Sequence, residues 1–255
     1  MAAPRTKACG SERVIGQGHI FAAFDRGQIP TISVVNQSSK GFGGNYPDFN
    51  KVVAALQHFV DGFFAPVWGT KCYLAPAKTV APGTWGLVFM DHPDVQDAYG
   101  YHDLTKDGLP LSKIFIDVCL ESGEQPSITA SHELAEMLVD PGIQLCAMDQ
   151  RGVLYAYETA DADEGSSFAI DGVSVTNFVY PSWFEGFRRP KSTKFDQLGR
   201  IDRPFRIMKG GYMSIFKGGA WSNIFGSKAA EKKFNLVQHN RAKVRITQRQ
   251  ISTKA

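Results

Sequence analysis

The sequence lacks any long, uninterrupted hydrophobic run. Its longest apolar neighbourhood, residues 59–68, is broken by Asp61, Gly62 and Pro66, whereas a membrane-spanning helix needs about 20 predominantly apolar residues in succession. The N-terminal segment MAAPRTKACGSERV also lacks the apolar core of a secretory signal. We therefore expect a cytoplasmic protein with no signal peptide, no transmembrane segment and no membrane partner.

Cysteine is scarce and scattered. The four residues, Cys9, Cys72, Cys119 and Cys146, include no CxxC pair, which argues against a zinc knuckle and against a dithiol redox site. Cys72 and Cys119 lie in apolar, strand-like runs, where a cysteine usually acts as a small buried hydrophobe. Reduced thiols are the expected state.

Repeats and a phosphate-binding loop are also missing. The glycines at 41–44 do not have the spacing, or the helix start, of a nucleotide-binding loop. With 255 residues and 43% apolar content, the chain can form one large domain with a substantial core.

Charge is unevenly distributed along the chain. Residues 227–255 hold eight Lys or Arg and one Glu, which leaves 20 basic and 24 acidic residues in the rest of the sequence. Such a basic tail can contact nucleic acid, an acidic surface or a partner subunit. A solvated, mobile terminus is the alternative interpretation.

The pattern of apolar residues predicts three parts: an N-terminal arm at 1–30, a domain at 31–226 and the basic tail at 227–255. Within the domain, residues 31–145 carry a sheet and two main helices, and residues 146–226 form a subdomain rich in β-structure and loops. The fold class is therefore α+β, with a mixed sheet backed by two helices. The expected elements are strands at 31–35, 71–75, 84–90, 113–120, 152–157 and 210–216, helices at 46–62 and near 127–140, and a tight hairpin at 168–176.

Residues 127–141, SITASHELAEMLVDP, carry the most informative pattern. Ser127 or Thr129 can cap a helix directly after Pro126. On that helix, residues four apart share one face, so His132 lies in line with the acidic residues 136 and 140, and residue 133 lies at the edge of this stripe. The opposite side is apolar. Such a polar stripe is either a site or a solvated surface.

The stripe contains the string HExxE, which is close to a known metal-binding pattern. In HExxH, two histidines one turn apart bind zinc, and the intervening glutamate acts on a metal-coordinated water. Glu136 at the second position is also an acceptable oxygen ligand for zinc. The string therefore predicts His132 and Glu136 as ligands and Glu133 as general base, with a solvated helix face as the alternative.

From about residue 31 to residue 164, the order strand, helix, three strands, helix resembles that of the zincin metallopeptidases. The resemblance is greatest to a branch whose third metal ligand is a glutamate about twenty residues beyond the helix, here Glu158, 22 residues after Glu136. In that branch an aspartate soon afterwards supports a metal-bound histidine, a role that would fall to Asp161. Asp140 can serve as an alternate ligand or as a local hydrogen-bonding group. The resemblance implies a zinc-dependent hydrolase acting on peptides or proteins.

A second resemblance covers more of the chain. Some uncharacterised phage and bacterial proteins carry a GYHD segment, an SHExxE helix ending in DP, and a downstream glutamate–aspartate pair, found here at 100–103, 131–141 and 158–161. This resemblance brings His102 to the site, as an extra ligand or as a donor to an oxyanion. It also keeps open another class: a catalytically inactive structural or interaction protein, virion-associated, with virion or homo-oligomer partners.

Overall fold

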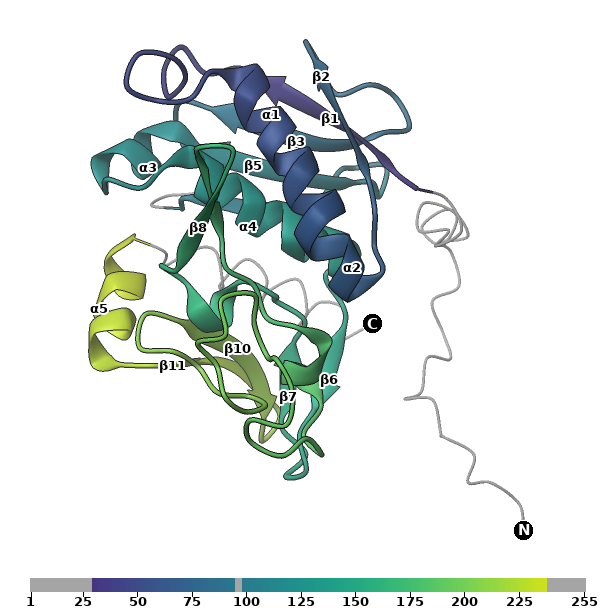
Figure 1. Ribbon diagram of the computed structural model, residues 1–255, viewed down its shortest axis with the longest axis vertical. Coiled ribbons are helices and arrows are strands. Elements are labelled where there is room, and N and C mark those ends of the chain that lie inside the picture. Colours follow the sequence, from purple (N-terminus) through teal and green to yellow (C-terminus); the bar gives the residue numbers. More distant parts are fainter. Residues whose placement is uncertain (1–28, 95–97, 238–255) are drawn as a thin grey trace.

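The computed structural model describes residues 29–94 and 98–237, and its fold is α+β (Figure 1). The expected N-terminal arm lies almost entirely outside the described residues. Across the described part, no helix is long and apolar enough to cross a membrane. The chain forms a large mixed sheet with its helices, followed by a second half of smaller sheets and loops, as the sequence predicts.

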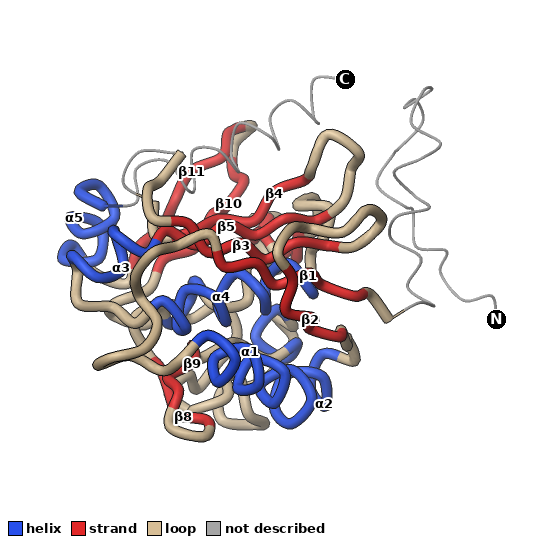
Figure 2. Tube along the Cα trace, turned by 90° about the horizontal axis from the view of Figure 1, so that it is seen from above, coloured by secondary structure: helices blue, strands red, loops and turns tan. Residues whose placement is uncertain are grey.

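The large sheet has five strands in the order β2-β1-β3-β5-β4. All neighbouring pairs are parallel except β4 with β5. The main helices α1 and α4 lie on the same face of this sheet (Figure 2). The strands are β1 (Thr31–Asn36), β2 (Tyr73–Ala77), β3 (Trp85–Met90), β4 (Gly100–Leu104) and β5 (Pro110–Phe115).

The first helix is longer than the predicted 46–62. It begins as α1 (Phe49–His58), continues through a π-helical segment (Phe59–Phe64) and ends as α2 (Ala65–Trp68). The Asp48 side chain caps α1 by accepting a hydrogen bond from the backbone N–H of residue 51. Pro66 lies in the first turn of α2, directly after the π-helical segment.

One strand boundary was predicted wrongly, and one strand of the large sheet was not predicted. The apolar run 113–120 is a strand only to Phe115, after which α3 (Ile116–Glu121) begins, because a continuous apolar run is equally compatible with a buried helix. No strand was predicted between 90 and 113, where β4 places His102 on a strand.

The central element is α4 (Pro126–Val139), which packs between the large sheet and the hairpin strand β9. Neither predicted cap is used, because Gln125 is the N-cap and Pro126 lies in the first turn. The Ser127 hydroxyl instead donates to the carbonyl of Ser174 in β9, at 2.7 Å. All but one of the 14 residues of α4 are buried, so the solvated-face interpretation of its polar stripe is wrong.

The second half contains a four-stranded sheet in the order β11-β10-β7-β6 and the hairpin β8-β9. Asp171 and Gly172 both have positive φ (51° and 77°) in the tight turn of this predicted hairpin. The last predicted strand was 210–216, so the prediction missed β11, which pairs with β10. The elements are β6 (Cys146–Met148), β7 (Leu154–Ala156), β8 (Ser167–Ile170), β9 (Val173–Thr176), β10 (Tyr212–Lys217), β11 (Ala220–Phe225), α5 (Lys228–Val237) and 3-10 turns at Asp161–Asp163 and Pro181–Phe184.

Candidate metal centre

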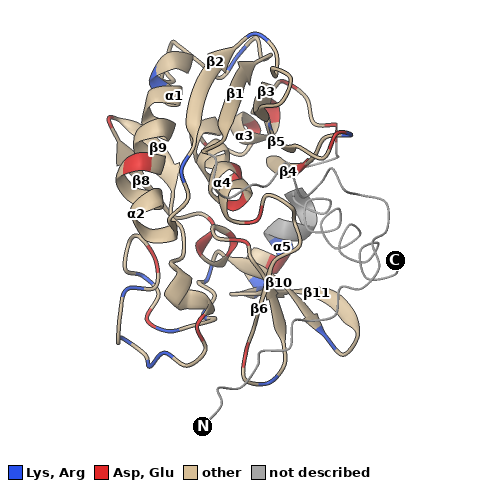
Figure 3. Cartoon of the chain, turned by 90° about the vertical axis from the view of Figure 1, so that its right-hand side faces the viewer, with Lys and Arg blue, Asp and Glu red and all other residues tan. Residues whose placement is uncertain are grey.

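The polar stripe of α4 lies in the interior of the protein. His132 is 4% exposed, and Glu133 and Glu136 are fully buried. Figure 3 shows acidic positions on α4 in the middle of the molecule, with basic residues mainly on outer loops and strand ends. Ionised groups are rarely buried unless they are paired with each other or bind a metal, so the partners of these side chains decide what the stripe does.

A first group consists of His132, Glu136 and Asp161, whose ligand atoms lie within 4.8 Å of one another. The Nε2 atom of His132 is 3.1 Å from Oε1 of Glu136 and 3.1 Å from Oδ1 of Asp161. Two of these residues come from α4, and the third comes from the second half of the chain. The group therefore joins the two halves at the centre of the fold.

A second group shares one member with the first. It consists of His102, Glu133 and Glu136, again with ligand atoms within 4.8 Å of one another. Nδ1 of His102 is 3.4 Å from Oε2 of Glu133 and 3.9 Å from Oε2 of Glu136. Sequence resemblance, rather than spacing, is the signal that brings His102 to this site, because 30 residues separate it from His132.

His102 reaches α4 because β4 packs closely against that helix. A Cβ atom at Gly100 would lie 2.8 Å from the carbonyl oxygen of Lys113, 2.9 Å from Thr129 Cγ2 and 3.3 Å from Glu133 Cγ. Only glycine allows the strand this close to both neighbours. Two residues along a strand share a face, so Gly100 and His102 both point toward α4.

A short, well-anchored loop presents Asp161. The backbone N–H of Ala160 donates to Oε1 of Glu136 at 3.3 Å, and Thr159 accepts a backbone hydrogen bond from Val179 at 2.7 Å. The 3-10 turn Asp161–Asp163 follows at once. Burial raises the pKa of Asp163 and outweighs the opposing effect of hydrogen bonds from Asn177 and Ser166. The loop is thus fixed on both sides of Asp161.

The structure places the other two predicted carboxylates differently. Among the described residues, Glu158 is fully buried in the same loop but belongs to neither group. Asp161 was predicted to support a metal ligand from behind. In the structure its Oδ1 lies 3.1 Å from His132 Nε2, so Asp161 itself belongs to the first group. Asp140 accepts hydrogen bonds from the backbone N–H groups of Gln144 and Leu145, at 2.9 and 3.0 Å, which is the local role that the sequence offered as an alternative to ligation.

The chemistry of the two groups fits a divalent cation. Together they contain three carboxylates and two imidazoles. With all three carboxylates ionised, the formal charge of the set is −1 when both histidines are protonated and −3 when both are neutral. Bringing such a set into a buried position is costly without a compensating positive charge. Imidazole nitrogen and carboxylate oxygen are also the ligand types that zinc accepts.

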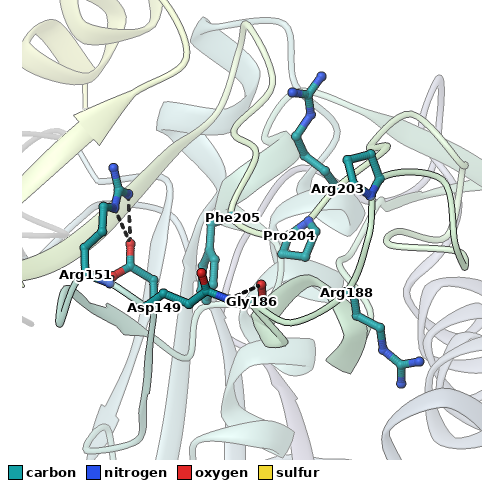
Figure 4. A pocket seen from close by; sticks show the side chains of 9 residues that line it. Asp149, Arg151, Gly186, Arg188, Arg203, Pro204 and Phe205 are labelled. Atoms are coloured by element: carbon teal, nitrogen blue, oxygen red, sulfur yellow. Dashed lines mark hydrogen bonds and ion pairs between the residues drawn. The ribbon is translucent and has the colours of Figure 1, made fainter.

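A surface pocket of about 300 Å³ lies elsewhere, in the second half of the chain (Figure 4). Asp149, Arg151, Arg188, Arg203 and Phe205 are among its lining residues. Burial raises the pKa of Asp149, but its hydrogen bonds with Arg151 and nearby backbone N–H groups lower that pKa overall. The three guanidinium groups point in different directions in Figure 4, so they do not converge on one ligand position.

Comparisons of the chain with protein-family models, with curated proteins and with solved structures found no match. The functional argument therefore depends on the side chains of the candidate centre.

Proposed function

We propose that the protein is a zinc-dependent hydrolase, with a peptide or protein as substrate, whose cation is held by His132, Glu136 and Asp161. One observation carries this proposal. An imidazole and one carboxylate on α4 and a second carboxylate beside it are all buried, and their ligand atoms lie within 4.8 Å of one another. The resemblance of residues 31–164 to zincin metallopeptidases supports the same class.

Donor spacing supports a small tetrahedral cation. Ligands at about 2.0–2.1 Å from a tetrahedral zinc lie about 3.3 Å from one another. The two distances measured from His132 Nε2 are both 3.1 Å, to Glu136 Oε1 and to Asp161 Oδ1. Both distances are close to that value, and the ligand atoms of the two carboxylates lie within 4.8 Å of each other.

The neighbouring residues suit a hydrolytic step. A bound zinc ion would supply Lewis acidity, which would lower the pKa of a coordinated water and polarise a carbonyl. Oε2 of Glu133 would then accept the proton of the attacking water and deliver it to the leaving amine. His102, with Nδ1 3.4 Å from that oxygen, would hold the carboxylate in place.

The sheet offers a means of aligning an extended substrate. Within the described part of the chain, β4 is an edge strand that pairs with β5 alone, and it carries His102. An edge strand presents unpaired backbone groups to which an extended peptide can add as a further strand. In the zincin arrangement that the sequence resembles, an edge strand beside the metal helix performs this task.

The substitution Glu133→Gln tests the proposed base while His132, Glu136 and Asp161 stay in place. It keeps the shape of the side chain but removes the base, so we expect at least about a 100-fold loss of peptidase activity while the zinc at His132 is retained. Glu121→Gln, which changes a solvent-exposed acid, is the matched control. Equal hydrolysis of unstructured peptides by wild type and Glu133→Gln would reject Glu133 as the base.

Burial of the centre favours a second candidate, a catalytically inactive protein that uses the same cation for structural support, for example as a virion component. The side chain of His132 is only 5% exposed, and those of Glu133 and His102 are fully buried. This candidate predicts that zinc raises stability and that neither wild type nor Glu133→Gln hydrolyses peptides. Measuring both properties on the same preparations separates the two functions.

A further inference from the structure

The two candidate groups are not independent, because Glu136 belongs to both. Its two carboxylate oxygens face different partners. Oε1 lies 3.1 Å from His132 Nε2, whereas Oε2 lies 3.9 Å from His102 Nδ1. One carboxylate thus stands between two imidazoles, and each imidazole has a further carboxylate beside it: Asp161 beside His132, and Glu133 beside His102.

We propose that the centre is dinuclear, with Glu136 bridging two divalent cations. His132 and Asp161 would complete one position, and His102 and Glu133 would complete the other. The proposal deepens the proposed function and rests on it, because the first position is the one already assigned to zinc. In two-metal hydrolytic sites the ions are about 3.5–4 Å apart, a separation that one carboxylate can span with its two oxygens.

This proposal gives a chemical reason for HExxE in place of HExxH. An imidazole fixed on a helix directs one nitrogen toward a site, whereas a carboxylate offers two oxygens and can bind two ions. A glutamate at position 136 is therefore the ligand that a second ion requires.

The dinuclear proposal changes the role of Glu133. With one ion bound, its carboxylate is available as a base, as described above. With two ions bound, the same carboxylate is a ligand of the second ion. The number of bound ions thus decides between the two roles, and it can be measured without any activity assay.

The test is the number of metal ions per chain. The full-length protein is stripped with a chelator, reloaded with Zn²⁺ or Co²⁺, freed of excess metal by gel filtration and analysed by plasma mass spectrometry. We expect two ions per chain in wild type and one in His102→Ala. Glu136→His restores the single-ion HExxH pattern, so it should also bind one ion. His92→Ala removes a highly exposed histidine and should leave two.

Each result has a distinct meaning. One ion in wild type, lost in His132→Ala and unchanged in His102→Ala, would overturn the dinuclear proposal and leave the proposed function intact. No ion in wild type would overturn both. If His102→Ala fails to fold, Co²⁺ titration of wild type still decides, because two equivalents are needed for saturation of the visible spectrum in a dinuclear protein and one in a mononuclear protein.

Discussion

Glu136 is the residue on which the account depends most. Its side chain is fully buried, lies 3.1 Å from His132 and accepts a hydrogen bond from the backbone N–H of Ala160. A glutamate in this position was the departure from the familiar motif, and in the structure it contacts both halves of the chain. If zinc binds as proposed, two carboxylates and one imidazole would neutralise more of its charge than two imidazoles and one carboxylate would, so we expect modest hydrolytic activity.

Asp161 and Glu158 can be distinguished by matched substitutions in the same loop. Asp161→Asn should lower zinc affinity, because Oδ1 of Asp161 lies 3.1 Å from Nε2 of His132. We expect a loss of at least about tenfold, the lower end of the losses seen when residues that support metal ligands are replaced. Glu158→Gln should have the smaller effect. Competition with a chromogenic chelator measures both affinities. A larger loss in Glu158→Gln would restore Glu158 as the third ligand.

Thiol reactivity tests whether Cys72 is buried in the core between the large sheet and its helices. Burial raises the pKa of Cys72 to about 12, and the thiolate is the reactive form. At pH 8 an alkylating reagent should modify Cys146, which is exposed, while Cys72 stays protected until the protein unfolds. Peptide mass spectrometry after brief labelling reports each site. Labelling of both thiols at similar rates would contradict the packing described.

At the scale of elements, the contact of β4 with α4 sets the position of His102. Gly100→Ala would force a methyl group to within 2.8 Å of the Lys113 carbonyl oxygen, so we expect a loss of about 1–3 kcal/mol in the free energy of unfolding, as for other overpacked sites. Urea denaturation measures this loss.

The helical Gly62→Ala is the matched control for Gly100→Ala. Its new Cβ would meet only the His58 side chain, at 3.0 Å, and alanine is the better helix former. Stability should therefore stay constant or rise slightly, by up to about 1 kcal/mol. If Gly100→Ala and Gly62→Ala changed the free energy of unfolding equally, the close contact of Gly100 with its neighbours would not explain the loss of stability.

The sequence predicted the elements of the site better than its geometry. Helical spacing placed His132, Glu133 and Glu136 on one helix, and α4 has almost the predicted bounds. It did not reveal that the stripe is buried, because hydrophobic periodicity assumes that a polar face meets solvent. The resemblance to one zincin branch favoured Glu158 as the third ligand, because the sequence could not show the 3-10 turn that places Asp161 beside His132.

On the scale of the whole molecule, the candidate centre connects two parts of the chain. α4 packs on the large sheet, and Asp161 comes from a loop that hydrogen-bonds to the second half through Thr159 and Val179. The division of 31–226 at residue 145 was predicted from the change in pattern. The contact between the two parts involves residues far apart in sequence, which patterning cannot reveal.

Because the proposed ligands come from both halves of the chain, we expect bound zinc to stabilise the two halves together. A ligand that binds only the folded state adds about 2.7 kcal/mol at a free concentration 100 times its dissociation constant. We expect the melting temperature of chelator-treated protein to rise by several degrees when zinc is restored, and to remain constant in His132→Ala. Differential scanning calorimetry of both proteins checks this. An identical rise in the two would place the stabilising ion elsewhere.

The basic tail gives an independent prediction for residues 227–255. Its first part forms α5, and residues 238–255 lie outside the described part of the chain. If the tail binds nucleic acid, affinity for duplex DNA should fall steeply as salt increases, because phosphate contacts release counterions. Truncation after Gly226 should remove this binding. Fluorescence anisotropy measures it, and salt-independent or unchanged binding would exclude the tail as the contact.

Metal content of wild type and His132→Ala tests the central claim most directly. His58→Ala is the control, because His58 is half exposed and pairs with Asp171 at the surface. The account predicts at least one tightly held zinc ion per chain in wild type and in His58→Ala, and a clear loss in His132→Ala. Equal, substoichiometric zinc in all three proteins would contradict it.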